Sequence, residues 1–419
     1  MATSARRLAN LLAPLIFAAG LAHLGYQAWK HWDVVTLDFR FFWLAGEFWL
    51  RGENPYDAAY AAAADAQFAI SNGAIWYYTP NWFPIAALLS LPDALTASRL
   101  WLVANAAMLV AGAVLNECAF RRLPAASALI DPDAPIAAFV FSLPRRMLVF
   151  LFAGVTALAQ ATGNTLHLGQ SSMLIYLGAS LLLFGAARRG PIAAAAGLAI
   201  LMLKPQIGVL ICAGLVFTTF GRRAILFAGL VSFAAAAPAF LITPPAELVS
   251  ALAGGISQYT DQAYNMPPAV TGLRHLAWIG SAPDLGSSFY LLLALAFIAA
   301  AGVAARLRTR PARTADVAAI AIAVAAMISP LHVYDFTLIA AIALYAVALP
   351  GVSGAISLAA FALSWRAGNL PHPAGLAADG VTYYPGSAYA SLAAIAIAVA
   401  IVRCLAETRR RAAPALSGA

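Results

Sequence analysis

The chain has 419 residues, of which 63% are hydrophobic and only 10% are charged. Soluble domains carry about 25% charged residues, and a compact soluble chain of this composition would lack the polar surface to cover its apolar interior. The net charge of +8 comes from short basic clusters between apolar runs, as in the cytoplasmic loops of membrane proteins. The composition therefore predicts an all-α polytopic protein in the lipid bilayer and argues against nucleic-acid binding.

The N-terminal part predicts one membrane helix followed by a long outer loop. The apolar run Leu8–Trp29 follows Arg6 and Arg7 and lacks a convincing cleavage site, so we interpret it as a retained helix rather than a signal peptide. Residues 30–80 then lie outside. Within them, the aromatic and amphipathic stretch 41–50 predicts an interfacial helix.

The short apolar piece at residues 81–95 makes it difficult to assign the neighbouring spans a consistent orientation in the membrane. The next full span, Leu100–Cys118, ends at Arg121 and Arg122, which the positive-inside rule places in the cytoplasm. A crossing by residues 81–95 is incompatible with that placement. We therefore expect this short piece to be re-entrant, unless one of the neighbouring spans is misassigned.

The rest of the chain orients without conflict. The apolar run Pro191–Phe220 is broken at Lys204-Pro205, and because proline removes a helix hydrogen bond, we expect a hairpin of two short helices there. A second outer loop occupies residues 244–287. The other expected spans are Met147–Ala161, Ser171–Ala187, Ala224–Ile242, Ser288–Ala305, Ala315–Ile328, His332–Leu349, Val352–Ser364 and Ala388–Val402.

These runs predict about 11 to 13 membrane or re-entrant helices. We expect them to form a single membrane domain, residues 1–405. A basic cytoplasmic tail, residues 406–419, follows it, and we expect this tail to be disordered.

Charged residues at membrane depth are costly and often functional, and three groups of them map to the outer side. Asp38 precedes the aromatic stretch, where a carboxylate can deprotonate a hydroxyl or cap the helix. Lys204, at the apex of the broken hairpin, can hold a phosphate or extend to the headgroups. His332 and Asp335 share a helix face. They can bind a phosphate, orient an acceptor, shuttle a proton or form a structural hydrogen bond at a helix start, but two ligands are too few to predict a metal.

A fourth polar group, His167-Leu168-Gly169-Gln170, stands at the outer start of a span. By itself it is typical of a turn at the entry to a helix.

The order of these features resembles glycosyltransferase family 87 over most of the chain, from about residue 20 to about residue 350. The first-loop acid and aromatic stretch are followed by the motifs Gly52-Glu53-Asn54-Pro55-Tyr56-Asp57, Trp76-Tyr77-Tyr78-Thr79-Pro80, Gly169-Gln170, Arg188-Arg189-Gly190, Lys204-Pro205-Gln206 and Ser329-Pro330 before His332 and Tyr334-Asp335. The family usually has Tyr-Pro-Pro where this chain has Tyr78-Thr79-Pro80.

The resemblance implies a GT-C-like enzyme of the inner (plasma) membrane whose active site faces the periplasm or extracytoplasmic side. Such enzymes transfer a sugar, chiefly mannose and in some cases arabinofuranose, from a polyprenyl-phosphate donor to a lipid-linked or polymeric glycan. The anomeric configuration inverts, and no nucleotide sugar, metal or other cofactor is expected. By resemblance Asp38 is the general base, and Lys204 holds the donor phosphate with His332. Further candidates for sugar or acceptor contacts are Asp335, Gln170, Tyr78 and Arg40.

Two other functions are compatible with a polytopic chain. A transporter or flippase of lipid-linked sugars predicts inverted repeats with paired broken helices, whereas this sequence shows one broken hairpin without a mate. A non-catalytic scaffold gives no reason for Asp38, Lys204 and His332 to map to one side of the membrane.

Overall fold

The computed structural model describes residues 2–70, 76–263, 302, 313–329, 331–370 and 385–412. Within these ranges the chain is helical and has no β-strand. Nearly all of the expected span Ser288–Ala305, most of the second outer loop and the end of the tail lie outside the described residues.

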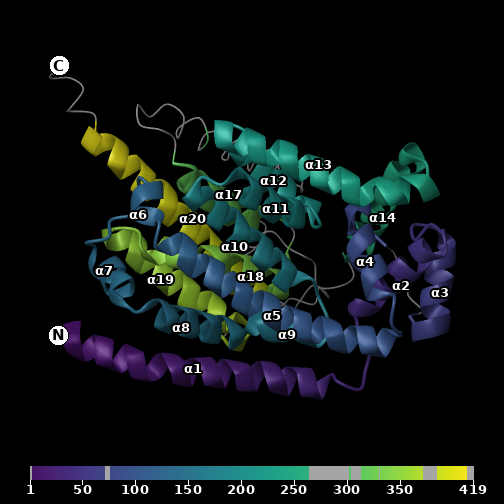
Figure 1. Ribbon diagram of the computed structural model, residues 1–419, viewed down its shortest axis with the longest axis horizontal. Helices are drawn as coiled ribbons and strands as arrows, with labels where there is room; N and C mark the ends of the chain where they lie inside the picture. The colour runs from purple at the N-terminus through teal and green to yellow at the C-terminus, as the bar shows by residue number, and fades with distance from the viewer. Residues whose placement is uncertain are drawn as a thin grey trace.

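The helices of the bundle run along the chain in the following order (Figure 1): α1 (Ala2–Lys30), α5 (Ala94–Phe120), α6 (Leu123–Ala126), α7 (Pro135–Ser142), α8 (Arg145–Ala157), α9 (Gln160–Leu168), α10 (Ser172–Arg188), α11 (Pro191–Leu201), α12 (Pro205–Leu215), α13 (Thr219–Ile242), α14 (Pro245–Ala263), α17 (Thr314–Ile328), η2 (Val333–Phe336), α18 (Thr337–Val347), α19 (Gly351–Trp365), η3 (Ala367–Asn369) and α20 (Pro385–Ala412). The first outer loop adds α2 (Phe39–Leu50), α3 (Ala58–Phe68), η1 (Pro80–Trp82) and α4 (Phe83–Leu89).

Four described helices are long and apolar enough to cross a membrane: α1, α5, α13 and α20. Helices α7 and α8 form one further span or re-entrant segment, bent by 111°. Large apolar side chains such as Leu15 and Phe233 are 59% and 65% exposed on α1 and α13, an arrangement that suits lipid and not water. The chain is therefore an all-α polytopic membrane protein, as its composition predicted.

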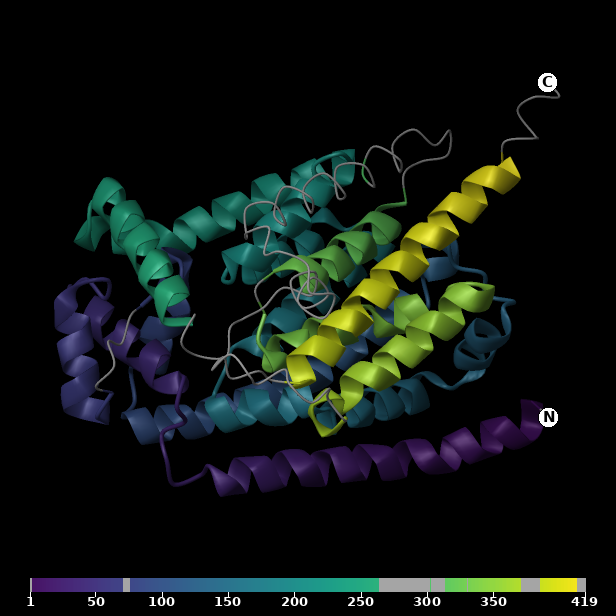
Figure 2. The ribbon, with the colours of Figure 1, turned by 180° about the vertical axis from the view of Figure 1, so that it is seen from behind.

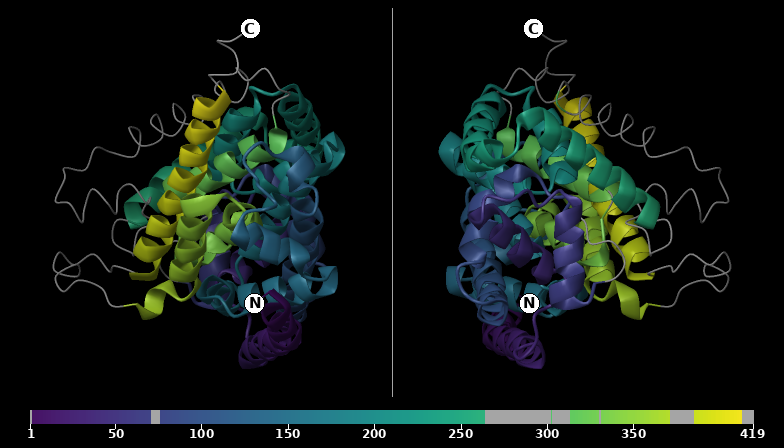
Figure 3. Two further views of the ribbon diagram at one scale, coloured as in Figure 1. Left: turned by 90° about the vertical axis from the view of Figure 1, so that its left-hand side faces the viewer. Right: turned by 90° about the vertical axis from the view of Figure 1, so that its right-hand side faces the viewer.

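Helix α10 lies at the centre of the bundle and contacts α5, α11, α17 and α18. Every residue of α17 and α18 is buried, whereas α1 lies at the periphery when the bundle is viewed from either end (Figure 3). Small residues bring the helices together. A Cβ atom on Gly197 of α11 would lie 2.5 Å from the Gly178 carbonyl oxygen of α10, so these backbones are in direct contact. From behind, α19 and α20 lie side by side (Figure 2).

Helices α2, α3 and α4 gather at the end of the bundle where α1 ends and α5 begins (Figure 1). We call this end the outer end, after the side of the membrane predicted for it from the sequence. The turn that carries Lys204 also lies there, because the Trp82 indole donates to the Leu203 carbonyl oxygen. Helix α4 has seven residues and is about 10 Å long, too short to cross a bilayer. Residues 81–95 therefore do not span, and the conflict of orientation disappears.

The expected interfacial helix is present as α2, but its environment differs from the prediction. Phe42, Phe48 and Trp49 are at most 3% exposed and pack in an aromatic cluster with Trp76 and Trp82. Helices α3, α4 and α5 cover α2, so these aromatic residues fill a protein core and do not face the headgroups.

The structure also tests the predicted helix break at Lys204-Pro205 and the predicted start of the C-terminal tail. The interruption at Lys204-Pro205 is present between α11 and α12. Its two arms pack mainly on different neighbours, α11 on α10 and α13, and α12 on α17. Helix α20 continues to Ala412, so the tail begins as helix and not as the disordered chain expected from residue 406 onward.

Candidate active site

The segment after α1 is fixed to the turn between α9 and α10. The Asp38 N–H donates to the Leu168 carbonyl oxygen over 2.7 Å, and the Trp101 indole N–H donates to the Gly169 carbonyl oxygen over 3.0 Å. Gly169 ends α9 in the left-handed region, with a φ of 74°. The turn expected from the sequence at residues 167–170 therefore also positions Asp38.

Gly169→Ala is expected to destabilise this junction. The left-handed backbone costs a residue with a Cβ atom roughly 1–2 kcal/mol, and that atom would lie 2.1 Å from Thr36 Oγ1. We expect a lower melting temperature in detergent, because the added Cβ atom would displace the turn that holds Asp38. Gly190→Ala is the matched control, since nothing lies within 4 Å of its added Cβ. Equal stability of the two variants would contradict this account of the turn.

Asp38 does not cap α2, although it directly precedes it. Its Oδ2 atom instead accepts a hydrogen bond of 2.6 Å from the Gln170 amide Nε2. Burial raises the pKa of Asp38 to about 6, against the opposing effects of the Gln170 hydrogen bond and the Lys204 charge. A carboxylate with this pKa is ionised at neutral pH and can still accept a proton, as a general base must.

Lys204 is buried, with 4% of its surface exposed, and pairs with Asp335, which is 3% exposed. The Nζ–Oδ1 distance is 2.5 Å, and the Ser172 hydroxyl donates to the same Asp335 oxygen over 2.8 Å. The Lys204 side chain therefore points into the protein and does not extend to the headgroups. Asp335, expected as a sugar or acceptor contact, holds the lysine.

Tyr334 links the Asp38 side of the site to the Lys204 side. Its hydroxyl lies 3.3 Å from Gln170 Nε2, and Lys204 Nζ lies 5.5 Å from the centre of its ring. The His332 ring stacks on it with 5.1 Å between centroids. Asp38, Gln170, Tyr334, Lys204 and Asp335 thus form one chain of contacts, which we call the Asp38–Lys204 network.

His332 lies beside this network. Its backbone N–H donates to Asp335 Oδ2 over 3.3 Å, so the sequence alternative of a structural hydrogen bond at the start of a helix is present at η2. A neutral imidazole can donate one hydrogen bond and accept another.

Arg40 and Tyr78 are placed differently from the other candidates. The Arg40 guanidinium donates to the carbonyl oxygens of Val35 and Phe68 and braces the first outer loop. Within the described part of the chain, these hydrogen bonds do not reach the Asp38–Lys204 network. Tyr78 is 8% exposed and lies in the aromatic cluster of α2. That cluster reaches the Lys204 turn through Trp82, whose indole N–H donates to the Leu203 carbonyl oxygen over 2.9 Å.

Tyr334 and Ser172 belong to the candidate site but were not among the residues predicted from the sequence. Tyr334 stands between His332 and Asp335 in the motif, and its polar hydroxyl beside two candidates was a usable signal. Ser172 resembles any helix-starting serine, so no sequence signal distinguished it.

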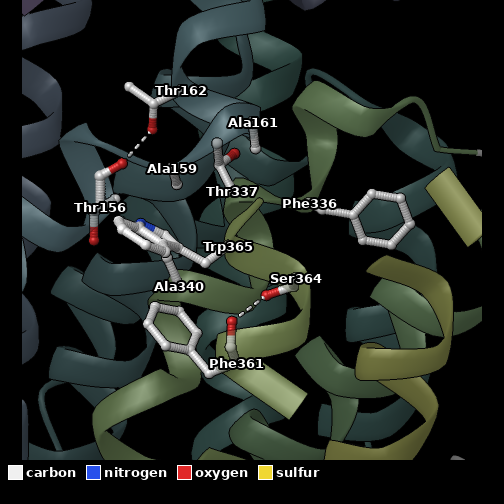
Figure 4. A pocket seen from close by; sticks show the side chains of 10 residues that line it. All are labelled: Thr156, Ala159, Ala161, Thr162, Phe336, Thr337, Ala340, Phe361, Ser364 and Trp365. Carbon is white, nitrogen blue, oxygen red and sulfur yellow. Dashed lines mark hydrogen bonds between the residues drawn. The ribbon is translucent and has the colours of Figure 1, made fainter. Parts of the chain in front are cut away.

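A small cavity lies between α8, α9, α18 and α19 (Figure 4), and two residues of its wall, Phe336 and Thr337, directly follow Asp335 in the chain. Its volume is about 20 Å³, and Phe336, Thr337 and Trp365 contribute to its walls. This is space for about one water molecule, and the buried Thr156 hydroxyl in its wall has no hydrogen-bond partner among the described residues. The cavity is therefore too small for a sugar.

Comparison with known families gives a match to glycosyltransferase family 87 over residues 76–330, more than half of the chain. The chain belongs to glycosyltransferase family 87. Comparison with curated proteins and with solved structures gives no significant match. Family 87 membership makes the protein a glycosyltransferase, and a glycosyltransferase in a membrane acts on a sugar donor and a glycan acceptor. The matched range contains Gln170 and Lys204, whereas Asp38 precedes it and His332 follows it.

Proposed function

We propose that this family 87 glycosyltransferase moves a sugar, mannose in the first place, from a polyprenyl-phosphate donor to a lipid-linked or polymeric glycan. We further propose that the transfer inverts the anomeric configuration, in a GT-C-like fold. The observation that carries the proposal is the Asp38–Lys204 network, which joins a partly buried carboxylate with a pKa near 6 to a buried lysine.

Asp38 acts as the general base in this proposal. The acceptor hydroxyl gives its proton to the Asp38 carboxylate, and its oxygen attacks the anomeric carbon of the donor sugar. The bond between that carbon and the phosphate oxygen breaks on the opposite face, so the configuration inverts. A single base is sufficient, because the polyprenyl phosphate leaves as a stable anion.

Lys204 stabilises the departing phosphate in this proposal, assisted by His332. An ammonium has three donors, and among the described side chains Lys204 donates a hydrogen bond to Asp335. Donors therefore remain for a phosphate oxygen. Because the surrounding site is buried, charge stabilisation by the lysine is stronger there than in water.

The distribution of basic residues supports an extracytoplasmic site in the plasma membrane. Arg121-Arg122 and Arg188-Arg189 end α5 and α10, two helices that begin at the outer end. Arg222-Arg223 lie near the start of α13, whose other end leads to α14. Cytoplasmic loops collect such residues, so the Asp38 end of the bundle is expected to face away from the cytoplasm.

The donor assay tests this function. Membranes containing the full chain are incubated with radiolabelled polyprenyl-phosphate mannose and, separately, polyprenyl-phosphate arabinofuranose, and label in lipid and glycan acceptors is counted. We expect transfer from the mannose donor above that in membranes without the protein. Folded protein that uses neither donor would overturn the proposal, and movement of intact donor across the bilayer without transfer would favour a flippase.

A further inference from the structure

A second polar groove lies at the outer end, between α1, α9 and the end of α19. Its volume is about 280 Å³, and its walls are more polar than apolar. This volume is close to the lower limit of ligand pockets, about 300 Å³. The groove therefore has room for a small headgroup and not for a long glycan. None of its wall residues belongs to the Asp38–Lys204 network.

The first wall of the groove is a polar stripe on a membrane helix. His23, Gln27 and Lys30 of α1 are four and three residues apart, which places them on one helix face. Polar side chains on a helix that crosses lipid are costly and are retained where they bind something.

The second wall is a matching stripe on α9. Gln160, Asn164 and His167 follow the same helical spacing. His167 Nδ1 lies 3.0 Å from His31 Nε2, and this contact joins α9 to the segment after α1. Two polar helix faces are thus held opposite each other across an open space.

The charge of the groove is positive. Lys30 and Arg366 line it, and no aspartate or glutamate does. Among the described residues, neither cation forms an ion pair with a carboxylate, whereas Lys204 does. Arginine and lysine together suit a phosphate, because the guanidinium forms paired hydrogen bonds and the ammonium adds a point charge.

The groove also lies at headgroup depth. The span Arg7–Lys30 has 24 residues and is about 36 Å long, slightly more than the hydrocarbon core of about 30 Å. Lys30 therefore reaches the interface. Tyr26 and Trp29, which are 54% and 72% exposed beside it, form the aromatic belt that marks this depth.

We propose that this groove binds the phosphate headgroup of an anionic membrane lipid, at a site separate from the Asp38–Lys204 network. The proposal does not depend on the transfer reaction. The groove still adjoins that network, because His167 precedes Leu168, whose carbonyl oxygen accepts the Asp38 N–H. A lipid seated there would brace α1 against α9 next to the candidate base.

Binding of labelled phosphatidylglycerol to the full chain in a nonionic detergent tests the proposal. We expect phosphatidylglycerol to bind at least tenfold more tightly than phosphatidylcholine, and the double variant Lys30→Gln/Arg366→Gln to lose that preference. Arg51→Gln is the matched control, since it removes an exposed positive charge from the first outer loop outside the groove. Unchanged affinity in the double variant would overturn the proposal.

A second pair of variants keeps the test decisive if the double variant does not fold. A Cβ atom on Gly163 would lie 3.5 Å from His23 Nε2, so Gly163→Ala fits, whereas Gly163→Leu fills the groove. We expect the leucine variant to lose phosphatidylglycerol binding and the alanine variant to retain it. Inorganic phosphate is expected not to compete; binding of free phosphate without binding of the lipid would assign the groove to a soluble anion and contradict the proposal.

Discussion

Asp38→Asn is expected to lower the rate of sugar transfer by about 10²- to 10⁴-fold, the usual contribution of a general base. The variant keeps the shape of the side chain and an oxygen that can accept the Gln170 hydrogen bond. It lacks a group that can take up the proton of an acceptor hydroxyl. The measurement is transfer of radiolabelled mannose at equal amounts of folded protein.

The pH dependence gives an independent readout of the same residue. Because the pKa of Asp38 is raised to about 6, wild-type kcat/KM is expected to rise with pH up to about 6 and then level off. The residual activity of Asp38→Asn is expected to lack this step. Asp33→Asn is the matched control, since Asp33 lies in the same segment and its side chain is 88% exposed.

The stability of the wild-type fold is expected to fall over the pH range in which its activity rises. A carboxyl whose pKa is higher in the folded state favours folding in its protonated form, so its ionisation costs stability as pH rises from about 4 through about 6. This effect corresponds to about 3 kcal/mol at most. Asp38→Asn is therefore expected to melt at or above the wild-type temperature at pH 7. A variant that loses activity and also melts far below wild type would indicate a structural role and contradict the assignment of Asp38 as the base.

Substitution of Lys204, which is paired with Asp335 in the protein interior, is expected to have a large effect on both stability and transfer. Lys204→Met leaves the Asp335 carboxylate buried without its cation, and the loss of one partner from a buried pair costs about 3–5 kcal/mol. We expect a large drop in melting temperature together with loss of transfer. The single variant alone does not separate these two effects.

The double variant Lys204→Met/Asp335→Asn separates them. Both charges are removed, and the asparagine oxygen can still accept the Ser172 hydrogen bond, so most of the lost stability is expected to return. Transfer is expected to stay at least 100-fold below wild type, because the lysine proposed to hold the donor phosphate is absent. A double variant that folds and transfers at the wild-type rate would restrict Lys204 to a structural role.

An exposed pair at the other end of the bundle serves as the control. Arg403 and Glu407 lie 2.8 Å apart on α20, and both side chains are about half exposed. Exposed pairs contribute about 0–1 kcal/mol, so Arg403→Gln is expected to leave both melting temperature and transfer close to wild type.

The sequence by itself determined the class of the protein and the positions of several of its long apolar helices. An apolar fraction of 63% excludes a soluble fold whatever the packing. Proline at position 205 interrupts a helix through its own missing N–H, so the break beside Lys204 was predictable from local chemistry. The order of the motifs was enough to indicate glycosyltransferase family 87, and the family comparison confirms it.

The tertiary structure decided which side chains of the candidate site contact one another. Gln170 lies 132 positions from Asp38, and Asp335 lies 131 positions from Lys204. Spacing along a helix predicts which residues share a face, but it carries no information about the helix that packs opposite. His332 and Asp335 were therefore recognised as neighbours, whereas the stronger contact of Asp335 with Lys204 was not foreseen.

The surroundings of α2 depended on tertiary structure for a related reason. Lipid tails and aromatic protein cores are similarly apolar, so an aromatic helix face has the same sequence pattern whether it meets lipid or protein. The packing of α3, α4 and α5 around α2 decided in favour of protein. That packing also holds Asp38 against the α9–α10 turn, which the sequence of either segment alone does not specify.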